Sequence, residues 1–180
     1  SVEHSLSSVP SLNVGLIQGN ISQDEKWEKG KAEKNLNTYR AGTKRLLESP
    51  VDIVIWPESA FPWTFNISDN IIDPRALGLP TEFLGRLPYT LFGAISENDT
   101  DNYFNSAILA DGSGNIVAKY HKAHLVPFGE YVPYKKILFF AKKLTQPAGN
   151  FLSGNSYEPL EANGTKLGVL ICYEDVFPEI

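Results

Sequence analysis

The chain has 180 residues, a formal net charge of -5 and 42% hydrophobic residues, which is enough apolar material for one sizeable core and favours a single domain. Its 16 basic residues are interspersed with 21 acidic ones and form no basic stripe, so we expect no nucleic-acid partner. One cysteine cannot form an internal disulfide, and three histidines give no cluster at zinc spacing. We therefore expect neither a metal nor a cofactor.

The sequence indicates where the folded domain begins and where it is cut short. Residues 1–11 are interpreted as a leader or linker, since Ser1 to Pro10 lack the apolar core of a signal peptide, and residues 12–180 as one folded domain. No uncharged apolar run approaches the roughly 18 residues that a membrane span needs. The sequence stops soon after Cys172, so we expect the domain to be truncated at its C-terminus.

The first third of the chain alternates between strand and helix patterns. Leu12 to Gln18 has the branched apolar positions of a strand, and a Gly-Asn pair ends it. From Asp24 to Glu48, apolar residues recur at helical spacing among lysines and glutamates, which predicts one amphipathic helix. Val51 to Trp56 is almost wholly apolar and is followed by Pro57, a pattern typical of a strand covered on both faces.

The middle of the chain predicts a loop and then a hairpin. Thr64 to Pro88 is rich in Asn, Asp, Pro and Gly, which indicates a loop with a short helix near Thr81 to Arg86. Tyr89 to Ser96 is another apolar strand. Tyr103 to Ala110 and Ile116 to His121 are joined by an Asp-Gly-Ser-Gly-Asn turn, as in a hairpin.

Two apolar segments follow. Ile137 to Ala141 lies between lysines, and we keep two interpretations open: an arm that dips into a membrane surface, or a plain core helix. Lys166 to Tyr173 predicts a strand that ends at Cys172. The resulting order of strands and helices indicates an α/β fold with no internal repeat.

Three side chains with chemical potential fall at or just beyond predicted strand ends. Cys172 ends an apolar run and is followed closely in the sequence by Glu174 and Asp175, a pattern that can expose a nucleophile at the edge of a sheet. An isolated cysteine in an apolar run is, however, usually a buried structural residue. Glu58 follows an apolar strand, where partial burial would suit a general base, but a surface turn gives the same pattern. Lys122 could stabilise an oxyanion, but most lysines are solvated. Sheets place ligand sites at the carboxyl ends of strands, so one shared pocket is expected.

Together, three blocks resemble the nitrilase, or carbon-nitrogen hydrolase, superfamily, whose catalytic triad is Glu-Lys-Cys. They are Trp56 to Ser59, Lys122 with the sequence His124 to Glu130, and Ile171 to Glu174. Within the superfamily the match is closest to the apolipoprotein N-acyltransferase family. That family's blocks resemble Gln18 to Ile21 followed by Trp27, then His124 to Pro133, and then Cys172 to Glu174.

The resemblance implies a fold and a set of roles. The fold is an α/β, nitrilase-like αββα sandwich of mixed sheets flanked by helices, here a catalytic domain over residues 12–180 that is incomplete at its C-terminus. Glu58 is implied as the general base, Lys122 as the oxyanion stabiliser and Cys172 as the nucleophile. The resemblance also implies additional essential carboxylates at Glu130 and Glu174, and residues of the acyl and substrate site at Trp27 and Tyr173.

The implied activity is N-acyl transfer in the biosynthesis of lipoproteins. An acyl chain passes from a phospholipid, through a thioester on Cys172, to the α-amino group of a diacylglyceryl-cysteine lipoprotein. The family is anchored in the bacterial inner membrane, and its catalytic domain faces the periplasm. A membrane location is therefore expected from the resemblance alone.

Two other functions remain open. A soluble carbon-nitrogen hydrolase could use the same triad on a small amide or nitrile, and would release ammonia. A non-catalytic binding module could keep the fold alone. Iodoacetamide distinguishes the module from an enzyme, because a thiolate of low pKa at Cys172 should react well below pH 8.5 whereas an inert thiol should not.

Overall fold

The computed structural model describes residues 11–26, 28, 30–81, 87–100, 102–126 and 151–177. Four sequence predictions fall outside these ranges: the leader up to residue 10, the role of Trp27, the role of Glu130, and the segment Ile137 to Ala141. Most of the predicted helix near Thr81 to Arg86 also falls outside them.

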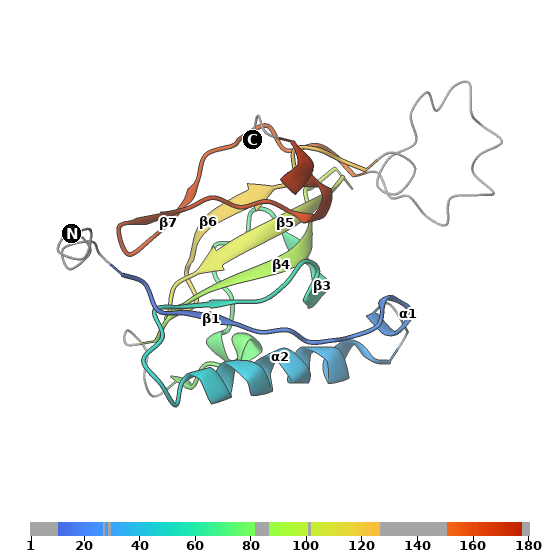
Figure 1. Ribbon diagram of the computed structural model, residues 1–180. Helices are drawn as coiled ribbons and strands as arrows, with labels where there is room; N and C mark the ends of the chain where they lie inside the picture. Colours follow the sequence, from blue (N-terminus) through green and yellow to red (C-terminus); the bar gives the residue numbers. More distant parts are fainter. Residues whose placement is uncertain are drawn as a thin grey trace, which may run out of the picture.

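A mixed sheet of six strands forms the centre of the described structure (Figure 1). Its main path is β1-β2-β4-β5-β6, and the remaining strand, β3, pairs with β4. β1 pairs with β2, and both β2 and β3 pair with β4, in parallel, whereas β5 is antiparallel to both of its neighbours, β4 and β6. The bounds are Val14–Leu16 (β1), Ile53–Ile55 (β2), Phe61–Asn66 (β3), Tyr89–Glu97 (β4), Tyr103–Ala110 (β5) and Ile116–His121 (β6).

The strand predictions are confirmed for β1, β2, β4 and the hairpin of β5 and β6, but β3 was missed. Residues 64–66 were assigned to a loop because Asn and Pro are frequent around them. Their pairing with Ser96 and Glu97 outweighs that composition, because a central strand supplies hydrogen-bond partners whatever the local propensity. The short 3-10 helix η2, Pro74–Leu77, follows β3 and is capped by the side chain of Asp73.

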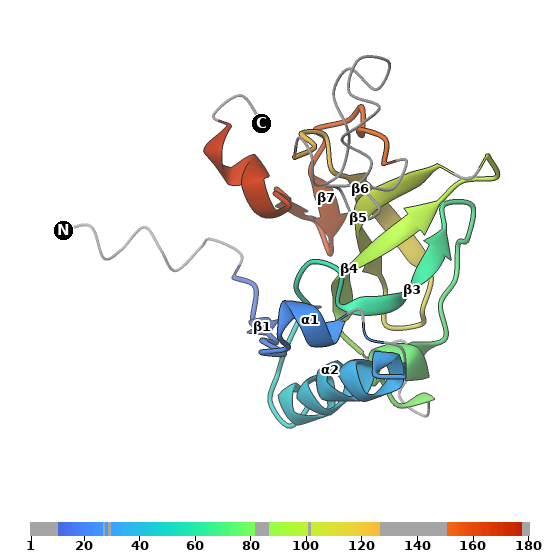
Figure 2. The same ribbon diagram turned by 90° about the vertical axis from the view of Figure 1, so that its right-hand side faces the viewer.

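The predicted continuous helix is instead two helices, α1 (Gln23–Lys26) and α2 (Ala32–Leu46). Gly30 lies between them with a φ of 90°, a left-handed conformation that glycine adopts without strain and that ends a right-handed helix. The break sets α1 apart as a separate four-residue helix beside the segment that enters β3 (Figure 2).

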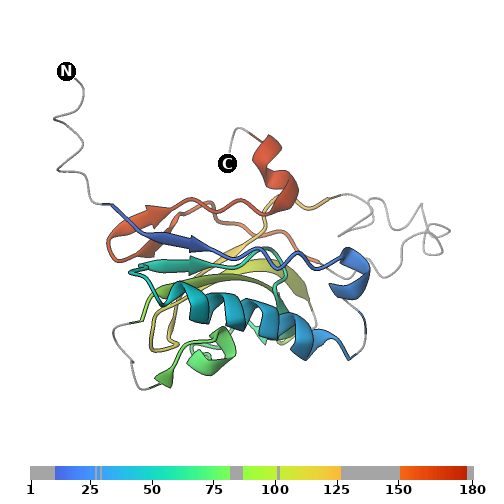
Figure 3. The ribbon, with the colours of Figure 1, turned by 60° about the horizontal axis from the view of Figure 1, so that its bottom comes forward.

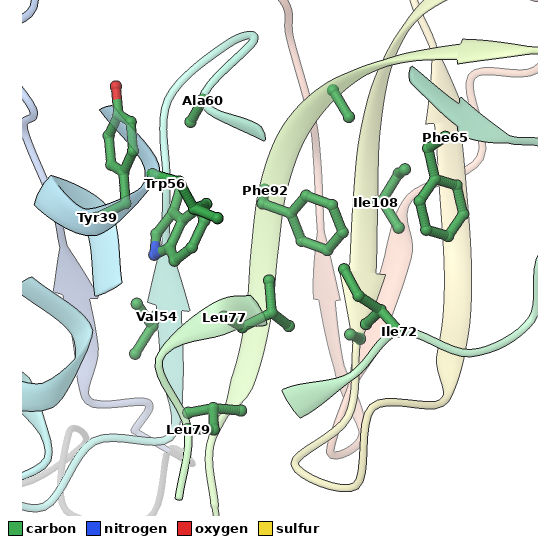
Figure 4. Close-up of a cluster of buried hydrophobic side chains, with 13 residues drawn as sticks. Tyr39, Val54, Trp56, Ala60, Phe65, Ile72, Leu77, Leu79, Phe92 and Ile108 are labelled. Carbon is green, nitrogen blue, oxygen red and sulfur yellow. The ribbon is translucent and has the colours of Figure 1, made fainter. Parts of the chain in front are cut away.

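The face of the sheet toward α2 carries the larger core (Figure 4). Trp56 stacks on Tyr39 of α2 with ring centroids 5.3 Å apart, and Phe92 of β4 lies on the other side of the indole. The indole Nε1 donates a hydrogen bond of 3.0 Å to Thr43 Oγ1, so its polar group is satisfied although the side chain is buried. These contacts fix the end of β2, from which the next residues leave the sheet.

The opposite face is covered by the last part of the chain (Figure 3). A two-stranded hairpin, β7 (Leu160–Ala162) and β8 (Thr165–Leu167), packs with Ile171 against this face, and the 3-10 helix η5 (Cys172–Val176) follows. Helix, sheet and hairpin form successive layers, so the α/β class is confirmed.

The predicted strand from Lys166 to Tyr173 is wrong beyond Leu167. Its apolar residues suggested a buried ladder. Instead, residues 168–171 have no strand partner, and Leu170 is 51% exposed. Asn163 and Gly164, both with positive φ, form a tight turn that pairs β8 with β7 in a short hairpin, and β8 ends where this pairing ends.

Candidate active site

Glu58 lies where the chain leaves the sheet between β2 and β3. Ile55, the last residue of β2, pairs with Leu91, and Phe61, the first of β3, pairs with Ala94. Both strands therefore pair with the same edge of β4. Between these paired positions the chain from β2 to β3 has five residues, 56–60, whereas β4 has only two, Phe92 and Gly93. The surplus forms an excursion, residues 56–60, that carries Glu58 out of the ladder and toward the pocket.

Gly93 is the residue of β4 that allows this excursion to pass. A Cβ placed on Gly93 would lie 2.6 Å from Glu58 Cα, Pro57 O and Ser59 N, all of them backbone atoms. Ser59 is itself in the left-handed region, with a φ of 49°. The backbone on both sides of Glu58 is thus fixed by close packing, and only glycine fits beneath it.

We expect Gly93→Ala to lower the free energy of unfolding by about 1–3 kcal/mol, because backbone cannot move aside as a flexible side chain can. Denaturant unfolding measures this change. Gly168→Ala is the matched control, since nothing lies within 4 Å of its added Cβ, and its effect should stay within about 0.5 kcal/mol. Equal unfolding midpoints for the two variants would show that the excursion does not need glycine.

The carboxylate of Glu58 is half-buried and is held by a side chain from β5. Asn105 Nδ2 donates a hydrogen bond of 2.6 Å to Glu58 Oε1. On its other side, the Glu58 carbonyl accepts a bond of 2.7 Å from Lys26 Nζ of α1. Glu58 therefore lies in a turn, as the surface-turn interpretation has it, but this turn is only partly exposed and the residue has a partner at its carboxylate and another at its carbonyl.

Cys172 begins η5 with a φ of 55°, in the left-handed region that a non-glycine residue adopts at some cost. An extended segment that turns sharply into a helix at a left-handed residue resembles the geometry of nucleophile elbows. The cysteine is exposed, so the interpretation as a buried structural residue is wrong. It lies five residues beyond the end of β8 and not at a strand end as predicted.

Glu58 and Cys172 line one pocket of about 250 Å³. Its remaining walls come from β2, β4, β5 and residues 169–171, and include Gly93 and Ala107. Most of this lining is apolar, which strengthens electrostatic effects on the polar groups inside. A volume near the lower end for ligand pockets suits the reacting atoms of a substrate.

Lys122 directly follows β6, as predicted, and its side chain is only 1% exposed. The solvated-surface interpretation is therefore wrong. The backbone N–H of Lys122 donates a hydrogen bond of 2.8 Å to the carbonyl oxygen of Asn105, and its carbonyl accepts one of 2.8 Å from the N–H of Gly154. Asn105 thus contacts both Glu58, through its side chain, and Lys122, through its backbone.

Glu174 links the Lys122 segment to the turn at Cys172. Its side chain is fully buried, and Oε1 accepts hydrogen bonds from Tyr120 Oη and from the N–H groups of Ala123 and His124. Oε2 accepts from the Ile171 N–H at 2.8 Å, the bond that caps the start of η5. Burial and the neighbouring Glu174 raise the pKa of Tyr120 well above its ordinary value, so its hydroxyl stays a donor.

Tyr173 is 50% exposed. Its ring meets Phe177 edge-on at 5.6 Å, and both rings line a second hollow together with His124, whose ring stacks on Phe177 at 4.3 Å. Cys172 and Tyr173, neighbours in the chain, therefore line two different hollows. This position is compatible with the substrate-site role that the family resemblance implies for Tyr173.

Sequence reasoning missed Asn105 and Lys26. Asn105 had a signal, since an amide in the otherwise apolar middle of a strand needs a partner when the strand is buried. Lys26 had none, because a lysine in a charged helical segment is ordinarily solvated. The partnership of Glu174 with the Lys122 segment was also unforeseen, because 51 residues separate it from Ala123.

Among the residues that the structure describes, no group of three or more His, Cys, Asp or Glu side chains is placed to hold a metal ion. Within the same ranges, no helix has both the length and the apolar content to cross a bilayer.

Comparison with known proteins identifies the family. The family model described as carbon-nitrogen hydrolase matches residues 13–180. The chain belongs to the carbon-nitrogen hydrolase family. This result agrees with the resemblance drawn from the three sequence blocks, and the match covers all residues of the site described above.

Among curated members of this family, the chain is similar to proteins named apolipoprotein N-acyltransferase. The protein from Geobacter metallireducens is 36% identical over 172 residues, which cover 94% of this chain and 32% of that protein. The protein from Azotobacter vinelandii is 35% identical, with 93% and 32% covered. The chain thus spans about a third of the length of these relatives.

Solved structures of the carbon-nitrogen hydrolase family share the fold. A mutant amidase from Nesterenkonia sp. AN1, with acrylamide added at its active site cysteine, superposes with a TM-score of 0.58 at 18% identity, over 94% of this chain and 60% of that one. A carbon-nitrogen hydrolase from Helicobacter pylori G27 gives a TM-score of 0.56 at 18% identity, over 93% and 53%. The predicted nitrilase-like fold is therefore confirmed.

Proposed function

We propose that this chain is the catalytic domain of an N-acyltransferase that uses Cys172 as its nucleophile. One observation carries the proposal. Glu58 and Cys172 line one pocket, and Asn105 and Glu174 connect both of them to the buried Lys122 segment. The relatives named apolipoprotein N-acyltransferase favour transfer of an acyl group over hydrolysis.

The first step forms a thioester. Glu58 takes the thiol proton of Cys172, and the sulfur adds to the ester carbonyl carbon of a phospholipid. The carbonyl π electrons move to oxygen, and the ammonium of Lys122 stabilises the resulting oxyanion. When this intermediate collapses, the C–O bond breaks and the lysophospholipid oxygen takes the proton back from Glu58.

The second step forms an amide. The α-amino nitrogen of a diacylglyceryl-cysteine lipoprotein adds to the thioester carbonyl while Glu58 accepts a proton from that nitrogen. Collapse breaks the C–S bond, the amide remains on the lipoprotein, and the sulfur is protonated by Glu58. The same three side chains therefore serve both half-reactions, and no cofactor is required.

Further roles in the proposal come from the family resemblance. Glu130 is a supporting carboxylate, Trp27 shapes the acyl and substrate site, and Tyr173 lines the substrate side of Cys172. The partners are a phospholipid donor, a lipoprotein acceptor and a bacterial inner membrane whose periplasmic side the domain faces. The segment Ile137 to Ala141 is a candidate arm at the lipid surface.

Intact-mass analysis of the full-length protein tests this proposal. Incubation with phospholipid and no acceptor should add the mass of one acyl chain to Cys172, and hydroxylamine should remove it because it cleaves thioesters. Cys172→Ala supplies the blank. If folded protein that retains substrate binding never gains an acyl mass on Cys172, the thioester mechanism is wrong.

Amide hydrolysis is the second candidate, because the family is named for attack on carbon-nitrogen bonds. The same triad would then act on a small amide, with water as the acceptor and ammonia as a product. Ammonia release from small amides without any phospholipid would favour this activity. Amide formation on a lipopeptide acceptor, with no ammonia, would favour acyl transfer.

A further inference from the structure

Lys26, the last residue of α1, contacts the excursion that carries Glu58. Its Nζ donates a hydrogen bond of 2.7 Å to the carbonyl oxygen of Glu58. The two residues are 32 positions apart, and α1 is a separate short helix beside the segment that enters β3 (Figure 2). This bond therefore ties the first part of the chain to the candidate base.

The position of Lys26 is costly for a cation. The side chain is half-buried, and this burial lowers its pKa below the ordinary value, while attraction to Glu58 opposes the shift. A lysine that served only solubility would extend into water and avoid this penalty. The cost indicates that the ammonium is kept in place for its contact with Glu58.

Three contacts hold Glu58 from three directions. Gly93 lies against its Cα, Asn105 binds its carboxylate, and Lys26 binds its carbonyl. The peptide after Glu58 leads into Ser59, whose φ of 49° departs from the conformation that most residues prefer. Without the Lys26 bond, this peptide keeps its packing on Gly93 but loses the hydrogen bond to its carbonyl, which removes one restraint on its orientation and on that of the carboxylate.

We propose that Lys26 is a positioning residue, which holds the Glu58 carboxylate at the orientation needed to take the proton of Cys172. The inference rests on the proposed function, because it takes Glu58 as the general base. It assigns a purpose to a lysine outside the Glu-Lys-Cys triad. It also makes α1 part of the site, although none of its residues is among the described lining of the Cys172 pocket.

The experiment compares four variants of the full-length protein: Lys26→Met, Lys26→Arg, Glu58→Gln and Lys34→Met. Lys34 is the matched control, because it is an exposed lysine on α2 with no bond to Glu58. Four quantities are measured: the rate of iodoacetamide alkylation at Cys172, mapped by mass spectrometry; the rate of thioester formation from phospholipid; the KM for phospholipid in that reaction; and the midpoint of thermal unfolding.

We expect Lys26→Met to slow both alkylation and thioester formation by about 10–100-fold, because a small misplacement of a catalytic group has an effect of this order. Its KM for phospholipid and its unfolding midpoint should stay near those of the wild type. Lys26→Arg keeps a charged donor and should recover most of the rate. Lys34→Met should match the wild type.

Wild-type rates in Lys26→Met, combined with slow rates in Glu58→Gln, would overturn the role of Lys26 alone. A lowered unfolding midpoint in Lys26→Met, with slow reactions that Lys26→Arg does not rescue, would also overturn it and make the lysine a structural anchor of α1. Wild-type rates in Glu58→Gln would instead overturn the proposed function, whatever Lys26→Met does.

Discussion

Cys172→Ser is expected to lower acyl transfer by about 10⁴-fold or more, a loss typical of removing an enzyme's nucleophile. A serine hydroxyl holds its proton far more tightly than a thiol and is a much weaker nucleophile at neutral pH, so it does not replace the sulfur. The fold should be unaffected, because the side chain is exposed and serine needs no more space. Transfer to a lipopeptide acceptor by the full-length protein measures the loss.

Thermal unfolding provides the control for this variant. An unchanged midpoint together with lost transfer separates chemistry from folding. If Cys172→Ser keeps more than about one hundredth of the wild-type activity, Cys172 is not the nucleophile, because an enzyme that has lost its nucleophile does not retain so much activity.

Glu174→Gln is expected to lower the free energy of unfolding by about 2–4 kcal/mol and to slow transfer by about 100-fold. One amide oxygen can replace Oε1, but the NH₂ group would face the Ile171 N–H, which then loses its acceptor in a buried site. The start of η5 shifts, and Cys172 shifts with it. Denaturant unfolding and steady-state kinetics measure the two effects.

Glu161→Gln is the matched control for Glu174→Gln. Glu161 is an exposed carboxylate on β7, so the same change of charge should alter stability by less than about 0.5 kcal/mol and leave transfer unchanged. If Glu174→Gln behaves like Glu161→Gln, the buried carboxylate has no part in holding Cys172.

Prediction from sequence worked best where local chemistry and pairing agree. The hairpin of β5 and β6 has apolar strands on both sides of an Asp-Gly-Ser-Gly-Asn turn, and its predicted bounds match the structure. β3 was not predicted: Phe61, Trp63 and Phe65 favour a strand, but Pro62 and Asn66 interrupt the pattern, and the pairing with β4 is long-range. The segment after Leu167 was predicted as a strand because its residues are apolar, but none of the described residues pairs with it as a strand.

In the candidate site, the main residues were predictable from the sequence but the contacts that hold them were not. Glu58, Lys122 and Cys172 were predicted from short motifs and from a family resemblance, and the structure brings Glu58 and Cys172 into one pocket. The contacts that hold them were not predictable, because Lys26, Asn105 and Glu174 reach their partners across long stretches of chain. Their side chains also have common structural uses, so residue type alone gives no reason to single them out.

The buried Glu174 has a consequence for the order in which the molecule matures. The N–H groups after Lys122 find their acceptor 51 and 50 residues later in the chain, and the turn at Cys172 depends on the same carboxylate. During synthesis, Glu58 and Lys122 therefore emerge well before Glu174, and the hydrogen bonds that join the Lys122 segment to the turn at Cys172 form only after Glu174 has emerged.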